Sequence, residues 1–146
     1  MKKEISSGNL DLKTFSDIVQ HQARLDINQN ALLKVKDSFQ FLSEFARDKV
    51  IYGINTGFGP MAQYRVEDEK GKQLQLNLIR SHASGTGDSI ADEDIRATML
   101  CRLNTLLLGY SGVHESAILC LKSFLNNNAL PLIPLHGGVG ASGDLV

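Results

Sequence analysis

Three small residues in a row near the C-terminal end of the sequence, Ala141, Ser142 and Gly143, are of types that can react with one another. Because glycine has no Cβ, the amide nitrogen of Gly143 can approach the carbonyl carbon of Ala141. Ring closure with loss of water, followed by dehydration of the Ser142 side chain, would give a five-membered ring that carries an exocyclic methylidene group. Such a ring is an electrophile made from the protein itself, and it would do the work of a bound cofactor.

The glycine-rich string around these residues has two other interpretations. Residues 138–143 match the pattern G-x-G-x-x-G, which binds dinucleotides when a strand precedes it and a helix follows it. Here Pro131 and Pro134 interrupt the preceding segment. Ser142 also resembles the serine of a nucleophile elbow, but Asp144 stands where that turn needs its second glycine. Both patterns therefore fit less well than the ring-forming tripeptide.

Tyr52, His82 and two asparagines have ordinary structural interpretations when they are considered alone. A tyrosine in an apolar segment usually packs in a core, and a histidine near a helix end usually caps carbonyl groups or lies in solvent. Tyrosine, with an ordinary pKa of about 10, is a poor base at neutral pH unless positive charge or hydrogen bonds favour its anion. Asn55 and Asn77 are expected to bridge backbone groups rather than to react.

The histidines and cysteines do not form a metal-binding pattern, because neither an H-x-x-x-H spacing nor a C-x-x-C pair occurs among them. These residues are His21, His82, Cys101, His114, Cys120 and His136. We therefore expect no metal site. Cys101 and Cys120 lie in apolar helical patterns, so we expect them to be reduced thiols in the core.

The elements that must position the reactive residues are mostly helices. Apolar residues three and four apart predict helices over residues 14–22, 29–46, 69–82, 91–108 and 114–126. Asn28 is a suitable N-cap for the second helix, and Ser89 with Asp92 forms an S-x-x-D start signal for the fourth. Residues 50–54 are β-branched and aromatic and favour a short extended segment. The expected fold is mainly α, with short strands and glycine-rich loops at residues 53–59, 85–87 and 137–143.

Composition narrows the class of protein. The chain has 146 residues, 42% of them hydrophobic, with 15 basic and 16 acidic side chains. This balance gives no basic field, which disfavours binding to nucleic acid or to an anionic membrane surface. No apolar run approaches the ~20 residues that span a bilayer, and the N-terminal residues lack the apolar block of a signal peptide. We therefore expect an intracellular, cytoplasmic protein with one domain.

Three longer segments carry a family resemblance. Residues 50–59 (VIYGINTGFG), 75–85 (QLNLIRSHASG) and 137–145 (GGVGASGDL) occur in this order. Together they resemble the aromatic amino-acid ammonia-lyases, a family that includes histidine, phenylalanine and tyrosine ammonia-lyases and related aminomutases. The resemblance covers the whole chain. Because the family's chains are much longer, residues 1–146 are expected to be an N-terminal fragment of the fumarase/aspartase-like helical fold, cut just after the tripeptide.

The resemblance implies a reaction and a cofactor. In the family, the tripeptide that Ala141, Ser142 and Gly143 match becomes a methylidene-imidazolone group. The substrate's α-amine adds to it, a base removes a β-hydrogen, and ammonia leaves to give a trans-unsaturated acid. Tyr52 matches the catalytic tyrosine, and the rigid turn that contains Gly59 would hold its phenol in place.

Substrate selectivity follows from two further positions. His82, preceded by Ser81, matches the position that contacts the substrate side chain, and the pair looks like the histidine ammonia-lyase pattern. A bacterial tyrosine ammonia-lyase branch shares the same pair. We expect L-histidine, converted to trans-urocanate, with L-tyrosine as the alternative and a non-catalytic helical interaction module as a third possibility. The family's sites are assembled by a homotetramer, so the fragment alone is expected to be inactive, with the ring unformed.

Overall fold

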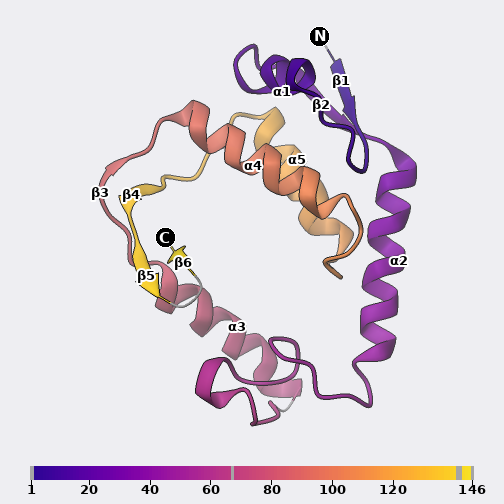
Figure 1. The fold of residues 1–146 in the computed structure, drawn as a ribbon, viewed down its shortest axis with the longest axis vertical. Helices are drawn as coiled ribbons and strands as arrows, with labels where there is room; N and C mark the ends of the chain where they lie inside the picture. The colour runs from indigo at the N-terminus through magenta and orange to yellow at the C-terminus, as the bar shows by residue number, and fades with distance from the viewer. Residues whose placement is uncertain (1, 67, 141–142, 146) are drawn as a thin grey trace. The chain divides into compact units, whose positions relative to one another are not determined.

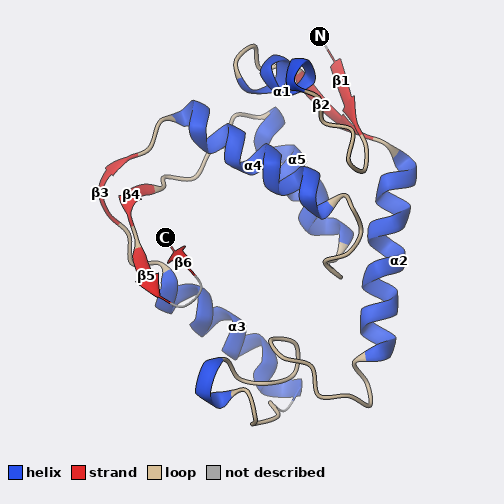
Figure 2. Cartoon of the chain, viewed as in Figure 1, coloured by secondary structure: helices blue, strands red, loops and turns tan. Residues whose placement is uncertain are grey.

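The computed structural model describes residues 2–66, 68–140 and 143–145. Its elements are β1 (Lys2–Ile5), α1 (Leu12–Val19), β2 (Arg24–Ile27), α2 (Gln29–Phe45), the 3-10 helix η1 (Gly59–Met61), α3 (Asp68–His82), β3 (Thr86–Ser89), α4 (Asp92–Leu106), α5 (Glu115–Asn126), β4 (Pro134–His136), β5 (Gly138–Gly140) and β6 (Gly143–Leu145). Figures 1 and 2 show that helices dominate and that the strands are short. The prediction of a mainly helical fold is therefore confirmed.

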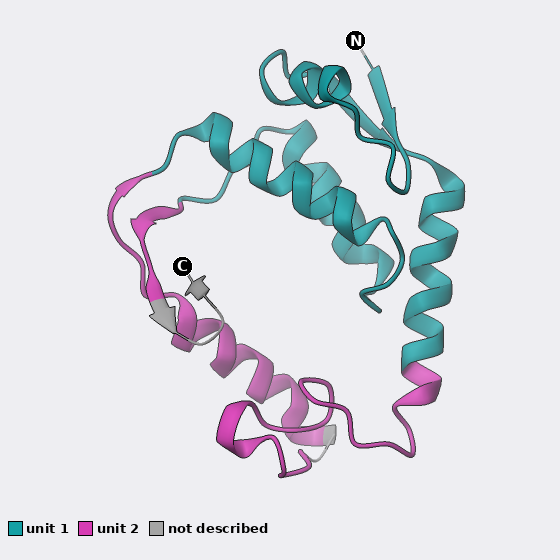
Figure 3. Cartoon of the chain, viewed as in Figure 1, with its two compact units in different colours: residues 1–42, 90–132 teal, residues 43–89, 133–146 magenta. Residues whose placement is uncertain are grey.

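The chain divides into two compact units, coloured separately in Figure 3. Unit 1 comprises residues 1–42 and 90–132, and unit 2 comprises residues 43–89 and 133–146. Each unit is thus built from two stretches of chain that are far apart in sequence. Among the described residues, no helix is both long enough and apolar enough to cross a membrane.

Unit 1 contains a packed apolar core. Its strands β1 and β2 pair in parallel, from Lys2 opposite Arg24 to Ile5 opposite Ile27. Alternation along β2 buries Leu25 and Ile27, as expected for strands with one covered face. Helix α4 packs against α1 and α5 and contributes much of the remaining core. The fully buried side chains of α4 are those of Ile95, Leu100 and Leu103.

Arg96 is a buried charged residue in this core, with 4% of its surface exposed. Its guanidinium donates hydrogen bonds to the carbonyl oxygens of Ile18 (3.0 Å) and Leu125 (3.1 Å) and to Oδ1 of Asn128 (2.9 Å). Burial lowers the pKa of the guanidinium. Since the three acceptors lie on α1 and at the end of α5, one side chain of α4 holds three helices together.

Asn126, the last residue of α5, completes the hydrogen bonding of β2. Its Oδ1 accepts from the backbone nitrogen of Leu25 at 2.7 Å, and its Nδ2 donates to the carbonyl oxygen of Leu25 at 2.9 Å. The side-chain amide therefore makes the two hydrogen bonds that a neighbouring strand would otherwise make with Leu25. These bonds connect the end of α5 to the β1–β2 sheet.

Two predicted helix boundaries are wrong. Helix α1 ends at Val19, before the predicted end at residue 22, where Gln22 has a positive φ of 49°. Ser89 does not cap α4, because it lies in β3 and its hydroxyl donates to the carbonyl oxygen of Ile133 at 3.3 Å. The N-cap of α4 is Ala91, which has no side-chain hydrogen bond. The serine that the local pattern assigned to the helix therefore lies in a strand, and its hydroxyl bonds to Ile133, 44 residues away.

The prediction that both cysteines are core thiols is also wrong. Cys101 and Cys120 are free and exposed. Cys101 directly follows the fully buried Leu100 on α4, so the helical rotation of about 100° per residue turns it outward. An apolar run that continues around a helix does not show which face packs.

Candidate active site

The segment that carries Tyr52 is a turn and not the extended segment predicted for residues 50–54. The backbone nitrogens of Ile54 and Asn55 both donate to the carbonyl oxygen of Ile51, at 3.1 and 3.2 Å. Gly53 has a φ of +76°, a conformation that glycine adopts without strain. These local bonds outweigh the extended preference of the β-branched residues.

The side chain of Asn55 stabilises this turn. Its Oδ1 accepts from the backbone nitrogen of Ile51 at 2.7 Å, and its Nδ2 donates to the carbonyl oxygens of Ala46 (3.3 Å) and Lys49 (2.7 Å). The predicted bridging role of Asn55 is confirmed. Asn77 differs, because its Oδ1 accepts from the side chain of Gln73 at 2.7 Å and not from a backbone group.

Tyr52 is held by the glycine-rich loop that follows it. The backbone nitrogen of Gly59 donates to the phenol oxygen of Tyr52 at 3.2 Å. The ring meets Phe58 edge to face, with centroids 6.0 Å apart. Tyr52 is 64% exposed, so it is not a packed core residue. A Cβ on Gly57 would lie 2.7 Å from both the Cβ and the carbonyl oxygen of Met61, so only glycine fits there without a shift of the backbone.

Ser81 and His82 form a small hydrogen-bonded group at the end of α3. The Nδ1 atom of His82 lies 2.7 Å from the carbonyl oxygen of Leu78 and 3.1 Å from Oγ of Ser81. The Ser81 hydroxyl donates to the same Leu78 oxygen at 2.8 Å. Because a carbonyl oxygen only accepts, this contact requires a proton on Nδ1, and in that neutral tautomer Nε2 is a hydrogen-bond acceptor.

Gly143, the last residue of the predicted cofactor-forming tripeptide, begins strand β6. Strand β5 pairs with β6, with Gly138 opposite Leu145, Val139 opposite Asp144 and Gly140 opposite Gly143. Ala141 and Ser142 lie outside the described residues. A strand followed directly by an antiparallel strand lacks the helix that a dinucleotide site and a nucleophile elbow both require, so those two interpretations of residues 138–143 are wrong.

The pairing of β3 with β4 connects the two parts of the site. The strands are antiparallel, with Thr86 opposite His136 and Ser89 opposite Pro134. His82 precedes Thr86 by four residues, and Gly138 follows His136 by two, so both leave the ladder at the same end. The segments that carry His82 and Gly138 therefore extend from the same end of the β3–β4 ladder. Within the described part of the chain, no hydrogen bond or ring contact joins Tyr52 to His82.

Comparison with known families identifies the class of protein. The family model described as aromatic amino acid lyase matches residues 10–146. The chain belongs to this family. The expectation drawn from the three sequence segments is therefore confirmed at the level of the family, and the matched range includes every candidate site residue of this aromatic amino acid lyase chain.

Curated relatives of this aromatic amino acid lyase chain include histidine ammonia-lyases. That of Streptococcus gordonii is 41% identical over 138 residues, which is 94% of this chain and 27% of the relative. That of Salmonella typhimurium is 39% identical over 97% of this chain and 28% of the relative. The chain thus spans little more than a quarter of the length of the curated relatives it matches.

Solved structures show the same fold. A tyrosine aminomutase from Streptomyces globisporus superposes with a TM-score of 0.86 at 30% identity, over 95% of this chain and 27% of that one. A histidine ammonia-lyase from Trypanosoma cruzi gives a TM-score of 0.82 at 26% identity, over 95% of this chain and 27% of that one. The arrangement of elements is therefore common to family members named for different substrates.

Sequence analysis missed one contributor to the site. The β3–β4 ladder was not predicted, because the residues of β3 (TGDS) are all exposed and give no apolar alternation. The contact of His82 with the carbonyl oxygen of Leu78 agrees with the expectation that a histidine near a helix end caps carbonyl groups. The position of Ser81 and His82 in the last turn of α3 was the available signal, since carbonyl groups there lack helical partners.

Proposed function

We propose that the protein to which this chain belongs removes ammonia from L-histidine without oxidation and releases trans-urocanate. The observation that carries this proposal is the β3–β4 pairing, because the segments that lead to His82 and to β5 extend from the same end of that ladder. A substrate-recognition group and an electrophile must be neighbours for this chemistry. The identities of about 40% to histidine ammonia-lyases support histidine as the substrate.

The hairpin fits the formation of a methylidene-imidazolone from Ala141, Ser142 and Gly143. Ring closure joins the nitrogen of Gly143 to the carbonyl carbon of Ala141, and the pairing of Gly140 with Gly143 brings the two ends of this short segment together. The group supplies an electrophile that makes the substrate's amine a good leaving group. We propose that the ring forms in the complete protein and that the 146-residue chain alone keeps Ser142 unmodified and is inactive.

Tyr52 is the proposed base. Its phenolate oxygen takes a β-proton from the substrate, the electrons of that C–H bond form the carbon–carbon double bond, and the Cα–N bond breaks. The Gly59 nitrogen presents a hydrogen-bond donor to this oxygen at 3.2 Å, where it favours negative charge. Asn55 holds the preceding turn, so the phenol is positioned by two separate groups of backbone contacts.

His82 is the proposed recognition residue. With its proton on Nδ1, it offers Nε2 as an acceptor for the N–H of a substrate imidazole. A phenol O–H also suits this acceptor, which makes L-tyrosine, converted to trans-p-coumarate, the second candidate. The superposition on a tyrosine aminomutase at 30% identity supports L-tyrosine as this second candidate. We further propose that the complete protein is a cytoplasmic homotetramer.

The test uses the complete polypeptide with L-histidine and L-tyrosine in parallel, followed by the ultraviolet absorbance of each unsaturated acid. We expect turnover of histidine to exceed that of tyrosine. Ser142→Ala removes the hydroxyl that dehydration needs, so this variant should lose activity while keeping its fold. Absence of turnover on both substrates would favour the non-catalytic interaction module instead, and full activity of Ser142→Ala would refute the role of the tripeptide.

A further inference from the structure

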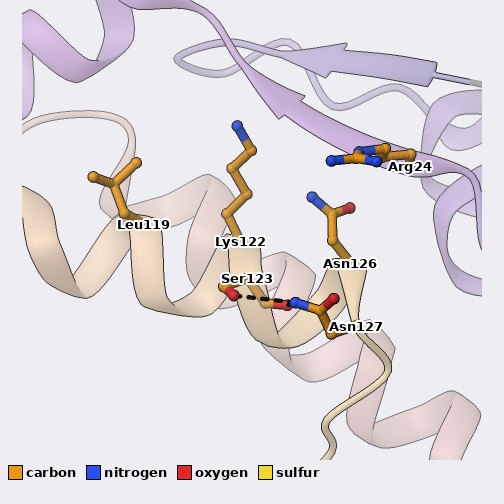
Figure 4. Close-up of a pocket in the computed structure, with 6 residues that line it drawn as sticks. All are labelled: Arg24, Leu119, Lys122, Ser123, Asn126 and Asn127. Carbon is orange, nitrogen blue, oxygen red and sulfur yellow. Dashed lines mark hydrogen bonds between the residues drawn. The ribbon is translucent and has the colours of Figure 1, made fainter.

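Unit 1 contains a polar pocket between β2 and α5 (Figure 4). Its volume is about 340 Å³, within the range of roughly 300–1,000 Å³ that is common for small-molecule sites. The residues that line it are Arg24, Leu119, Lys122, Ser123, Asn126 and Asn127. Leu119 is the one apolar residue of this set, so the pocket suits a polar ligand. None of the six is a candidate active-site residue.

The charges around the pocket are unbalanced. Lys2 and Lys122 each place their ammonium nitrogen 2.6 Å from an oxygen of Asp26, and these hydrogen bonds hold the pKa of that carboxyl well below its usual range. The guanidinium of Arg24 has no hydrogen bond or ion pair with any residue that the structure describes. Glu4 stands opposite Asp26 in the same ladder, so three cations, Lys2, Arg24 and Lys122, face two carboxylates.

The position of Arg24 makes this excess costly without a bound anion. Arg24 lies directly opposite Lys2 in the parallel ladder of β1 and β2. Like charges in opposed positions of a sheet destabilise it. Asp26 pairs with Lys2 and Lys122, and no ion pair joins it to Arg24 among the described residues. An anion in the pocket would remove the imbalance.

The other polar groups of the pocket add donors. Ser123 Oγ accepts from Nδ2 of Asn127 at 3.2 Å, which leaves the Ser123 O–H to donate. Asn126 uses one hydrogen of its Nδ2 for the carbonyl oxygen of Leu25, which leaves the second. In Figure 4, Arg24 extends from its strand toward Asn126, and Lys122 rises from α5 beside them. Donors from two elements therefore face one space.

We propose that this pocket binds a phosphate dianion, either inorganic phosphate or the phosphate of a small phosphomonoester. The planar fork of an arginine matches phosphate oxygens in a bidentate arrangement, and charge-assisted hydrogen bonds of this kind are the strong ones. The lining holds two cations, Arg24 and Lys122, and no carboxylate, which suits a dianion. The volume leaves room for a small organic group beside the phosphate.

The experiment titrates the 146-residue chain with sodium phosphate and, separately, with glycerol phosphate, at an ionic strength held constant with sodium chloride. Amide chemical shifts should move saturably at Arg24 and along residues 119–127. Arg24→Gln should weaken binding by about tenfold or more, and Ser123→Ala by roughly two- to tenfold. Arg102→Gln removes another exposed guanidinium from the same unit and should leave the affinity within about twofold.

The two ligands distinguish the source of the phosphate. Tighter binding of glycerol phosphate supports a phosphomonoester, and equal or weaker binding supports inorganic phosphate. The proposal is overturned if chloride alone produces the same shifts, or if Arg24→Gln and Ser123→Ala both bind phosphate as the unsubstituted chain does. Circular dichroism spectra confirm that the variants are folded. The result does not depend on lyase activity.

Discussion

The backbone nitrogen of Gly59 donates a hydrogen bond to the phenol oxygen of Tyr52, seven residues earlier in the chain, at 3.2 Å. Gly59 reaches this position with a φ of +55°, and apart from its neighbours in the chain no residue has a heavy atom within 4 Å of where its Cβ would stand. Backbone conformation, and not lack of space, is therefore what requires glycine here. The glycine of the turn thus positions the phenol oxygen that we propose as the base.

Substitution of this glycine should affect activity more than folding. Gly59→Ala places a Cβ in the left-handed region, at a cost of about 1–2 kcal/mol, and the loop relieves that strain by moving the nitrogen away from Tyr52. We expect kcat of the complete protein to fall about tenfold or more, with KM less changed. Gly71→Ala is the matched control, because Gly71 lies in α3 with open space around it. That variant should be slightly more stable and fully active.

Loss of the Asn55 side chain should loosen the turn that precedes Tyr52. Asn55→Ala removes three hydrogen bonds to backbone groups, each worth about 1 kcal/mol. Hydrogen exchange at the amide of Ile51 should accelerate strongly. Asn77→Ala, which removes one exposed bond to Gln73, should leave that amide unchanged. Equal exchange rates in both variants would contradict the bridging role of Asn55.

Replacement of Arg96 should destabilise unit 1. Arg96→Met keeps the length of the side chain but leaves the carbonyl oxygens of Ile18 and Leu125 without their donors in a buried site. We expect the free energy of unfolding to fall by about 2–4 kcal/mol. Urea denaturation provides the measurement, and Arg102→Met, an exposed change on the same helix, should stay within about 0.5 kcal/mol of the unsubstituted chain.

Asp26 should make stability depend on pH in the acid range. The ammonium groups of Lys122 and Lys2 lower the pKa of this carboxyl in the folded state from its ordinary value of 3.8. Below that value the unfolded chain takes up the proton more readily than the folded chain does, so stability is present above it and is lost as the pH falls. Asp26→Asn should reduce stability near neutral pH and flatten this part of the dependence. The measurement is the Tm from neutral pH into the acid range. If Asp26 contributed nothing, the Tm of Asp26→Asn and that of the unsubstituted chain would change with pH in parallel.

The protonation of His82 can be observed directly. The contact of Nδ1 with the carbonyl oxygen of Leu78 at 2.7 Å requires a proton on Nδ1, so the neutral ring should adopt the Nδ1–H tautomer. Nitrogen-15 spectra of the neutral ring should show Nε2 without a proton. A proton on Nε2 as the main form would remove the acceptor that substrate recognition requires in our proposal.

Much of the site could be predicted from the sequence because its signals are local. The tripeptide at residues 141–143, the glycine turn after Tyr52 and the Ser81-His82 pair are each short strings whose order matched a family, and residues 10–146 do belong to that family. The helices were predicted to within a few residues because their apolar spacing extends over many turns. Local propensity failed at residues 50–54, where hydrogen bonds from Asn55 and a positive φ at Gly53 produce a turn.

The sequence by itself determined the mainly helical class, the family and the residues whose types suit the chemistry. The tertiary structure alone decided that Ser89 belongs to a strand, that Asn126 completes the hydrogen bonding of Leu25 from 101 residues away, and that Cys101 faces outward. The physical reason is that side-chain type and spacing encode short-range hydrogen bonding and burial. Which distant backbone group satisfies a given donor depends on packing, and no periodicity in the chain records it.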